Sequence, residues 1–261
     1  MRQTARNVAV IDNPHHVNPS ARNVPVPRPV IYAMTTNTAK PDKVAIIGAS
    51  GTYGCGVLAR AEQLGVHAVV VTRSPHKFND VKPTTTIVDT QLNEHQKLTR
   101  AFTGCDGVIS ALGDHRKLRP KTHCLPHVWN AMKAVGVTKY VGMASGAMMM
   151  PGESRGLFQH TVHPLLGTLK LFGVDFLQQN EWERDSLITG ANGADGITWV
   201  ITRIVRPTRT PFVGAHVHKD KRGPINCSIY DLGDFCLHAV ASNQWNKLAP
   251  HVSSGPQPKT K

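Results

Sequence analysis

The sequence predicts an α/β protein in which one doubly wound parallel sheet forms a single domain. From residue 43 onward, short apolar runs typical of strands alternate with helical patterns. A glycine-rich turn joins the first of these strands to the first helix. The chain has 261 residues and is 40% hydrophobic, which is enough for one large core. Together these features are typical of a Rossmann-type sheet with helices on both faces and right-handed crossovers.

Strands are expected where short apolar runs end in a polar residue, and helices where apolar residues recur three or four apart. Pro126 falls within one predicted helix. A proline is tolerated there only if it falls in the first turn, because a proline further inside removes a backbone hydrogen bond. The predicted strands are 44–47, 68–72, 86–88, 107–112, 140–144 and 197–201, and the predicted helices are 57–64, 94–102, 122–135, 175–188 and 231–240.

Both ends of the chain are expected to be disordered extensions. Residues 1–40 hold five prolines, which break helices, and Asp12 is their single acid. This basic, arginine-rich start also resembles a mitochondrial transit peptide, so a mitochondrial location remains the alternative to a cytoplasmic one. Translation could start at Met1 or at Met34. The predicted organisation is therefore an extension at 1–40, a dinucleotide-binding domain at 41–246 with its substrate region at 147–230, and a disordered tail at 247–261.

The charge balance favours anionic partners. The chain has 30 Lys and Arg against 17 Asp and Glu, a formal charge of +13. The basic residues are spread along the chain, which argues against a nucleic-acid module. Five cysteines without a C-x-x-C pair favour free thiols in a reducing compartment. No apolar run reaches the roughly 20 residues that span a bilayer, and no metal site is expected. The oligomeric state stays open.

The glycine-rich turn predicts a site for the pyrophosphate of a dinucleotide. Gly48, Gly51 and Gly54 follow a buried strand and open a helix with the spacing G-x-x-G-x-x-G. The first allows a sharp turn, the second leaves room for a phosphate, and the third allows close packing of the helix, whose N-terminus favours an anion. A glycine-rich turn without a ligand is the alternative. The predicted contacts are Gly48, Ser50, Gly51, Thr52, Tyr53 and Gly54.

The ends of the next two strands indicate which dinucleotide is bound. An acid after the second strand would accept from the ribose 2′-hydroxyl of NAD, but Arg73 stands there and offers a planar fork to a 2′-phosphate. Lys77 adds a second charge. These residues predict NADP rather than NAD, unless Arg73 is simply a solvated base. Asp89 ends the third strand, where it would meet the adenine or serve as a loop acid or cap.

Ser145, after the fifth strand, is the predicted catalytic residue. Its hydroxyl can hydrogen-bond a substrate carbonyl or the nicotinamide amide. Reductases of this architecture usually add a Tyr-x-x-x-Lys pair, whose tyrosine acts as the acid. None of the four tyrosines here has a lysine four residues later. Protonation then comes from solvent or a histidine, or the protein does not reduce ketones in this way, or it is not an enzyme.

Basic and polar residues beyond Ser145 are candidates for substrate binding. Arg203 and Arg206 follow the sixth strand and would make the mouth of the crevice cationic, although a solvated basic loop is as good an interpretation. His160 is a candidate proton donor, with a helix-surface histidine as the alternative. The methionines at 148–150 would form an adaptable wall or an ordinary apolar loop.

Several motifs resemble the atypical short-chain dehydrogenase/reductase superfamily over about residues 43–242. Within it, the chain is most similar to the NAD(P)H-binding group that contains biliverdin-IXβ reductase/flavin reductase and the NmrA-like proteins. Ile204 departs from the proline usual after Arg203, and residues 147–175 and 190–196 resemble insertions. The motifs are Gly48-Ala-Ser-Gly-Thr-Tyr-Gly54, the run ending at Arg73, Val108-Ile-Ser-Ala-Leu-Gly113, Met143-Ala-Ser-Gly146, Trp199-Val-Ile-Thr-Arg203 and Tyr230-Asp-Leu-Gly-Asp-Phe235.

The resemblance implies a one-domain fold that binds NADP, with the nicotinamide near Leu112, Gly113 and Ser145. Reductases of this group pass hydride to flavins or linear tetrapyrroles and need no tyrosine. The resemblance therefore implies an NADPH-dependent reductase of a flavin-like or other conjugated small molecule. A non-enzymatic NADP sensor or scaffold, as in NmrA-like proteins, is the second interpretation. An accessory subunit of a mitochondrial complex is the third.

Overall fold

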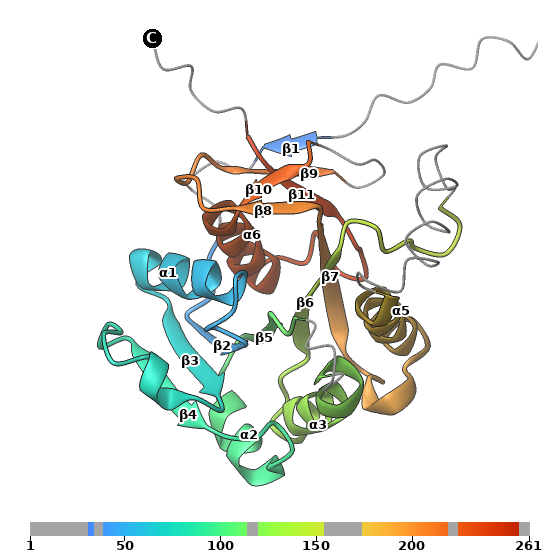
Figure 1. The fold of residues 1–261 in the computed structure, drawn as a ribbon. Helices are drawn as coiled ribbons and strands as arrows, with labels where there is room; N and C mark the ends of the chain where they lie inside the picture. Colours follow the sequence, from blue (N-terminus) through green and yellow to red (C-terminus); the bar gives the residue numbers. More distant parts are fainter. Residues whose placement is uncertain (1–30, 34–38, 114–119, 154–173, 219–223, 256–261) are drawn as a thin grey trace, which may run out of the picture.

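The computed structural model describes residues 31–33, 39–113, 120–153, 174–218 and 224–255. Its centre is a nine-stranded sheet with the order β1-β9-β11-β7-β6-β5-β2-β3-β4 (Figure 1). Seven strands, β4, β3, β2, β5, β6, β7 and β11 in their order across the sheet, are parallel to one another. Strands β9 and β1 follow β11 and form an antiparallel edge. The strands of this sheet are Ile31–Ala33 (β1), Lys43–Ile47 (β2), His67–Thr72 (β3), Thr85–Asp89 (β4), Gly107–Ser110 (β5), Lys139–Ser145 (β6), Thr198–Ile204 (β7), Ala215–His218 (β9) and His251–Ser254 (β11).

Helices cover both faces of the sheet, as the alternating pattern predicted. One apolar core lies between the sheet and α1 with α6, and a second lies between the sheet and α2, α3 and α5. The described helices are Gly54–Leu64 (α1), His95–Phe102 (α2), Pro120–Ala134 (α3), Val174–Thr189 (α5) and Ile229–Ala241 (α6), with short 3₁₀ turns at Pro75–Lys77 (η2) and Ala191–Gly193 (η3). The predicted doubly wound α/β fold is confirmed.

The order of the parallel strands sets the place of the site. The chain winds outward from β2 through β3 to β4, then returns to β5 on the other side of β2 and continues to β6 and β7. The direction therefore reverses between β2 and β5. In sheets of this kind ligands bind beyond the carboxyl ends of the strands at that reversal. The turn after β2 and the segment after β5 lie there.

A second, two-stranded sheet lies beyond the carboxyl end of β7. It consists of Arg206–Thr208 (β8) and Asn226–Ser228 (β10), which run parallel. Ser228 is also the N-cap of α6, because its side chain accepts a hydrogen bond from the Tyr230 N–H. This small sheet therefore links the end of the central sheet to α6 (Figure 1).

The prediction of a disordered tail at 247–261 is wrong for residues 247–255. Residues 251–254 form β11, which pairs with β9 and β7, and Val252 is buried. The strand is short and polar at three of its four positions, so its own sequence carries little strand signal. The sheet edge, rather than local propensity, orders it.

The predicted extension at 1–40 also contributes a strand, since Ile31–Ala33 pairs with β9. Most of that extension lies outside the described residues. The condition set for Pro126, a place in the first turn, is not met, because α3 covers Pro120–Ala134 and Pro126 lies in its interior. Leu125, Val128 and Trp129 are buried on the same helix, and this packing outweighs the lost backbone hydrogen bond.

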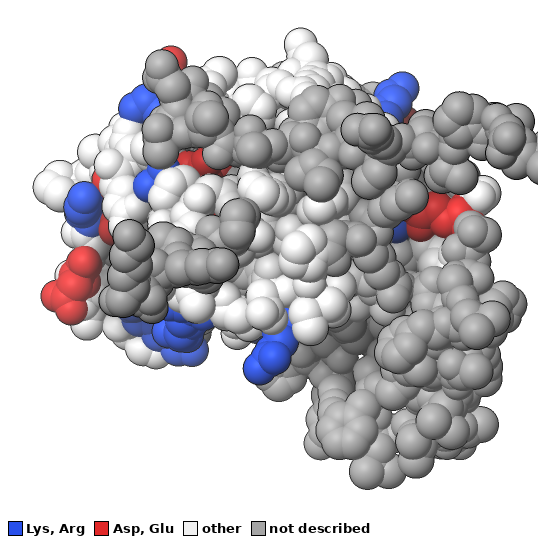
Figure 2. All heavy atoms as spheres, turned by 90° about the horizontal axis from the view of Figure 1, so that it is seen from above, with Lys and Arg blue, Asp and Glu red and all other residues white. Residues whose placement is uncertain are grey.

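Charge is dispersed on the face seen from above in Figure 2. Positive and negative side chains of the described residues are scattered over this face, and a central area of the described surface holds neither sign. Within the described part of the chain, no helix is long and apolar enough to cross a membrane.

Candidate functional site

The turn after β2 has the geometry of a phosphate-binding loop. Gly48 has a φ of +79°, and the Gly51 N–H donates to the Gly48 carbonyl at 2.9 Å. A Cβ on Gly48 would lie 2.7 Å from the Ala111 carbonyl oxygen, and one on Gly54 would lie 2.2 Å from the Gly48 carbonyl oxygen. Both positions therefore require glycine. Gly51 is less crowded, with its nearest neighbour at 3.2 Å from an added Cβ, so its lack of a side chain leaves space on the outer side of the turn.

The same turn exposes hydrogen-bond donors. Ser50, Gly51 and Thr52 are exposed, and among the described residues the Ser50 and Thr52 N–H groups donate to no acceptor. The turn leads directly into α1, whose first turn carries no acid and whose N-cap residue, Tyr53, makes no side-chain capping bond. Free N–H groups and a positive helix end fit a pyrophosphate. The residues present therefore fit the dinucleotide predicted from the sequence.

Tyr53 turns toward the protein interior. It packs against the core between the sheet and α1. Burial, and to a smaller extent the nearby Cys227 thiol, raise the pKa of its phenol. Its backbone belongs to the phosphate turn while its ring anchors the turn near the small sheet.

The residues predicted for the ribose and adenine lie together at the ends of β3 and β4. Arg73 follows β3 directly and is exposed, and Lys77 is exposed in η2. Asp89, the last residue of β4, is in register with Thr72. Among the described residues Arg73 and Lys77 make no ion pair, so both charges are available to a ligand. Arg73 also lies near Cys124 of α3, where its charge opposes the increase in thiol pKa that burial causes.

The predicted nicotinamide region brings together the segment after β5 and the end of β6. The Ala111 N–H donates to the Ile47 carbonyl at 2.9 Å, which holds the start of this segment against the glycine turn. Leu112 is half-buried, and Gly113 is exposed with open space around it. Ser145 is the last residue of β6 and is half-buried; its Oγ accepts a hydrogen bond from the Ala147 N–H at 3.1 Å. The hydroxyl proton donates to no described residue, so it is available to a ligand.

An apolar ledge lies beside Ser145. Ser145 is in register with Ile204 of β7, and the Gly146 N–H donates to the Ile204 carbonyl at 2.7 Å. The next residue, Val205, is 47% exposed, and Ile225 is 57% exposed. The Arg206 N–H donates to the Ile225 carbonyl at 2.9 Å, so the two apolar side chains come from adjacent segments. Exposed apolar side chains at a strand end favour an apolar ligand surface.

Arg203 does not have the environment predicted for a substrate-binding residue. Its side chain is only 2% exposed, and its guanidinium donates to both carboxylate oxygens of Glu153, at 2.6 and 2.7 Å, and to the Ala249 carbonyl at 2.6 Å. It therefore ties the loop after β6 to the C-terminal segment. Burial raises the pKa of Glu153, but the bonds from Arg203 and the Met150 N–H outweigh it and lower that pKa overall. Arg206 is exposed, and His160 lies outside the described residues.

A buried polar cluster joins β6 to α3 and α5, and the sequence did not indicate it. Lys121 Nζ donates to the Met143 carbonyl, Asn180 Oδ1 and Glu183 Oε2, each at 2.6 Å. The Tyr140 hydroxyl donates to Glu183 Oε1 at 2.6 Å. Lys121, Tyr140 and Glu183 are at most 1% exposed. A lysine next to apolar positions of α3 was the available signal, but its partner Glu183 lies 62 residues away, on a face of α5 that also buries Gln179, Asn180 and Ser186.

This cluster contains a tyrosine and a lysine but cannot act as the acid of a reductase. Burial, with the neighbouring Glu183 carboxylate, raises the pKa of Tyr140 well above its ordinary value. All three ammonium protons of Lys121 are used within the cluster. The cluster instead fixes Met143, two residues before Ser145. Among the described residues, no group of three or more potential ligands could hold a metal ion.

The fold, the glycine turn and the free donors after β2 define a Rossmann-type dinucleotide-binding protein. Residues 48–243 match the model of the NAD(P)H-binding family, and the chain belongs to this family. The cofactor class predicted from the sequence is therefore confirmed at the level of NAD(P)H. Two of the solved structures with the same fold are described as short-chain dehydrogenases/reductases, the group that the motifs resemble.

Three solved structures illustrate the likeness, which at these identities concerns the fold. The oxidoreductase ylbE from Lactococcus lactis has a TM-score of 0.64 at 13% identity, over 82% of this chain and 91% of that one. A short-chain dehydrogenase/reductase from Veillonella parvula in complex with NADP has a TM-score of 0.61 at 14% identity, over 83% and 96%. ChuY, an anaerobilin reductase from Escherichia coli O157:H7, has a TM-score of 0.60 at 13% identity, over 84% and 100%.

Proposed function

We propose that the protein is an NADPH-dependent reductase that passes hydride to a flavin-like or other conjugated small molecule. The observation that carries the proposal is the pairing of an exposed glycine turn and Arg73 at the end of the neighbouring strand, neither of which has a partner for these groups among the described residues: the Ser50 and Thr52 N–H groups have no acceptor, and Arg73 has no ion pair. The first fits a pyrophosphate and the second fits a 2′-phosphate. One of the solved structures with this fold holds NADP, which supports the same preference.

The proposed cofactor contacts follow the edge of the sheet. Gly48, Ser50, Gly51, Thr52, Tyr53 and Gly54 would surround the pyrophosphate, Arg73 and Lys77 the 2′-phosphate, Asp89 the adenine end, and Leu112 and Gly113 the nicotinamide. NADPH supplies the hydride when bound. The protein then has to align the cofactor with the acceptor and exclude water from between them.

The acceptor would lie between Ser145 and the ledge formed by Val205 and Ile225. The ledge offers apolar contact to a flat ring system. The Ser145 proton, which has no acceptor among the described residues, can donate to a carbonyl or ring nitrogen of the acceptor. Arg206, exposed next to the ledge, would favour an acceptor that carries a carboxylate or phosphate. Tyr140 and Lys121 are buried and hydrogen-bonded to Glu183, so the proton would reach the acceptor from solvent.

The test is the oxidation of NADPH with a panel of flavins, linear tetrapyrroles and quinones. We expect turnover with at least one planar acceptor and a lower rate with NADH. Tight NADPH binding without turnover on any acceptor would contradict the proposal.

A non-enzymatic NADP sensor is the second candidate. It is favoured by one observation: Tyr140 and Lys121 are buried and both bonded to Glu183, so this tyrosine–lysine pair is closed to a substrate. A sensor predicts NADP binding, no turnover, and a protease-sensitivity pattern that differs between the NADP-bound and free forms. Identical patterns in the two forms would remove this candidate.

A further inference from the structure

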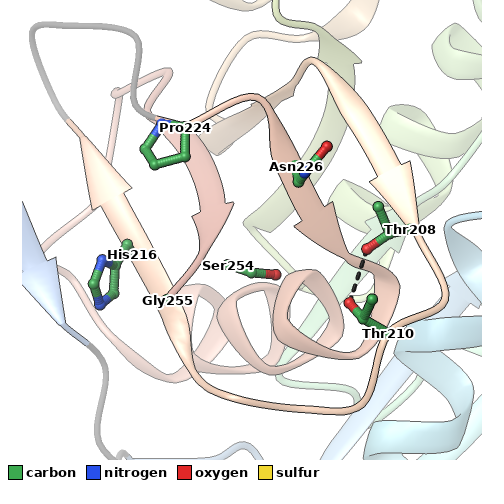
Figure 3. Close-up of a pocket in the computed structure, with 7 residues that line it drawn as sticks. All are labelled: Thr208, Thr210, His216, Pro224, Asn226, Ser254 and Gly255. Carbon is green, nitrogen blue, oxygen red and sulfur yellow. Dashed lines mark hydrogen bonds between the residues drawn. The ribbon is translucent and has the colours of Figure 1, made fainter. Parts of the chain in front are cut away.

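A hollow separate from the candidate cofactor site lies between the small β8–β10 sheet and strands β9 and β11 (Figure 3). Its volume is about 290 Å³. Side chains alternate along a strand, so Asn226 faces the hollow while Cys227 points the other way, into the core where it lies near Tyr53. The hollow and the cofactor turn are therefore on opposite faces of the small sheet. Its lining residues are Thr208, Thr210, His216, Pro224, Asn226, Ser254 and Gly255.

The floor of the hollow offers no place for a cation. Ser254 Oγ accepts from the Ser228 N–H at 2.6 Å and donates to Asp231 Oδ2 at 2.5 Å. The other oxygen of Asp231 accepts from the Val213 and Gly214 N–H groups, both at 2.9 Å. Both oxygens of the buried carboxylate beneath the floor are thus engaged by donors, and its charge is satisfied within the protein.

The walls, in contrast, carry unused hydrogen-bonding groups. The Asn226 amide on β10 and the His216 ring on β9 make no hydrogen bond within the described part of the chain, and they stand on different sides of the hollow (Figure 3). The Thr208 and Thr210 hydroxyls share one hydrogen bond of 2.9 Å, which uses one of their two protons. Three kinds of donor therefore surround the same space: an amide, an imidazole and a hydroxyl.

The rim adds a positive charge and an apolar surface. Arg206 is in register with Asn226 and stands two residues before Thr208, so all three share one face of the small sheet. Arg206 is exposed and pairs with no described carboxylate. The Pro224 ring and the threonine methyl groups line part of the wall. The positive charge and the apolar wall together fit a small organic anion with a short carbon chain.

We propose that this hollow binds a small organic oxyanion, a carboxylate or a phosphate ester. Asn226, His216 and the free threonine hydroxyl proton donate to its oxygens, and Arg206 provides the opposite charge at the rim. Arg206 is the one residue that this proposal shares with the proposed acceptor site. The residues that line the hollow belong to no other proposed site, so their response to an anion does not depend on the reductase function.

The test is an NMR titration of amide resonances in the full chain saturated with NADP, which occupies the phosphate sites of the cofactor. The probes are inorganic phosphate, acetate and, as a neutral comparison, glycerol. We expect at least one anion to shift the amides of Thr208, Thr210, Asn226 and Gly255 with a Kd of about 1 mM, and glycerol to leave them unchanged. These amides report on the hollow and not on the cofactor site. A failure of NADP to bind can therefore be distinguished from a failure of the hollow to bind an anion.

A matched pair of variants tests the assignment. Asn226→Asp keeps the size of the side chain and adds a negative charge, so it should weaken anion binding about tenfold or more. Asn93→Asp makes the same change at an exposed residue elsewhere and should have no effect. Three results would overturn the proposal. The amide resonances could stay unchanged at about 10 mM of both phosphate and acetate, or they could respond equally to glycerol. The Asn226→Asp variant could also bind the anions as tightly as the native chain does.

Discussion

At the level of single residues, Ser145 and Arg203 show how environment decides what a polar side chain can do. Both lie at the carboxyl ends of neighbouring strands and both were candidates for substrate contact. Ser145 accepts one backbone hydrogen bond, and its proton donates to no residue that the structure describes. Arg203 is buried, with its guanidinium engaged by Glu153 and two backbone carbonyls. The first remains a candidate for catalysis, while the second has a structural role.

Ser145→Ala should therefore lower the catalytic efficiency of the proposed reductase. The loss of one hydrogen bond to the acceptor is worth about 1–2 kcal/mol, or roughly five- to thirtyfold in kcat/KM. NADPH affinity, measured by fluorescence titration, should not change. Ser242→Ala is the control, because the Ser242 Oγ also accepts from an N–H two residues later, that of Gln244, and lies outside the proposed sites. An unchanged kcat/KM in Ser145→Ala would mean that the hydroxyl does not contact the acceptor.

At the level of secondary-structure elements, β6 is held in place by the helices beneath it. The Lys121 ammonium on α3 bonds the Met143 carbonyl of β6 and Glu183 of α5, so one buried group joins three elements. A Cβ on Gly142 would lie 2.3 Å from Glu183 Oε1, which shows how closely the carboxylate approaches the strand. The position of Ser145 thus depends on a cluster that no ligand touches.

Glu183→Gln should strongly destabilise the fold, because it leaves the Lys121 charge buried without a counter-charge. The expected loss is about 3–5 kcal/mol in the free energy of unfolding, measured by urea denaturation. A double variant, Lys121→Met with Glu183→Gln, removes the buried charge as well and should recover part of that loss. If the double variant is less stable than Glu183→Gln, the ion pair is not the source of the effect.

The Arg203–Glu153 pair should make the free energy of unfolding decrease at acidic pH. The folded-state pKa of Glu153 lies below its ordinary value of 4.5, so the carboxylate contributes stability that is complete above that value and is lost as the pH falls through the lower folded-state pKa. Glu153→Gln should therefore flatten the acid side of the stability profile. Urea midpoints between pH 7 and pH 3 measure this, with Glu181→Gln as the control. Equal slopes in all three proteins would contradict the assignment.

The strands and helices could be predicted because their signals are local. The buried run from Val44 to Ile47 and the glycine spacing after it are visible in a short window, and they correctly predict a strand, a tight turn and a helix. The Lys121–Glu183 contact could not be predicted, since its partners are brought together only by packing of α3 on α5. Strand β11 was missed for a related reason. Its four residues are mostly polar, and they form a strand because they pair with β7 on one side and β9 on the other.

At the level of the whole molecule, the C-terminal segment completes the sheet. It bonds β7 through the Leu248 and Pro250 carbonyls, pairs with β9, and supplies Ala249 as the acceptor for Arg203. The chain from 247 to 255 is thus part of the domain that binds the cofactor rather than an appendage to it.

A truncation after residue 246 should lower the free energy of unfolding by about 3 kcal/mol or more. It removes buried Val252, worth about 1.5–3 kcal/mol, together with several strand hydrogen bonds of about 1 kcal/mol each. A truncation after residue 255 keeps β11 and should match the full chain. Thermal unfolding followed by circular dichroism compares them. Equal midpoints for the two truncations would show that β11 contributes little.

The central claim is that the turn from Gly48 to Gly54 and Arg73 together form an NADP site. Calorimetric titration with NADP and with NAD, on the native chain and on Arg73→Glu, tests it most directly. We predict that the native chain prefers NADP and that Arg73→Glu weakens NADP binding at least about tenfold while leaving NAD binding within about twofold. Arg100→Glu, an exposed arginine on α2, should behave as the native chain does. A native chain that prefers NAD, or an Arg73→Glu variant that keeps the NADP preference, would contradict the claim.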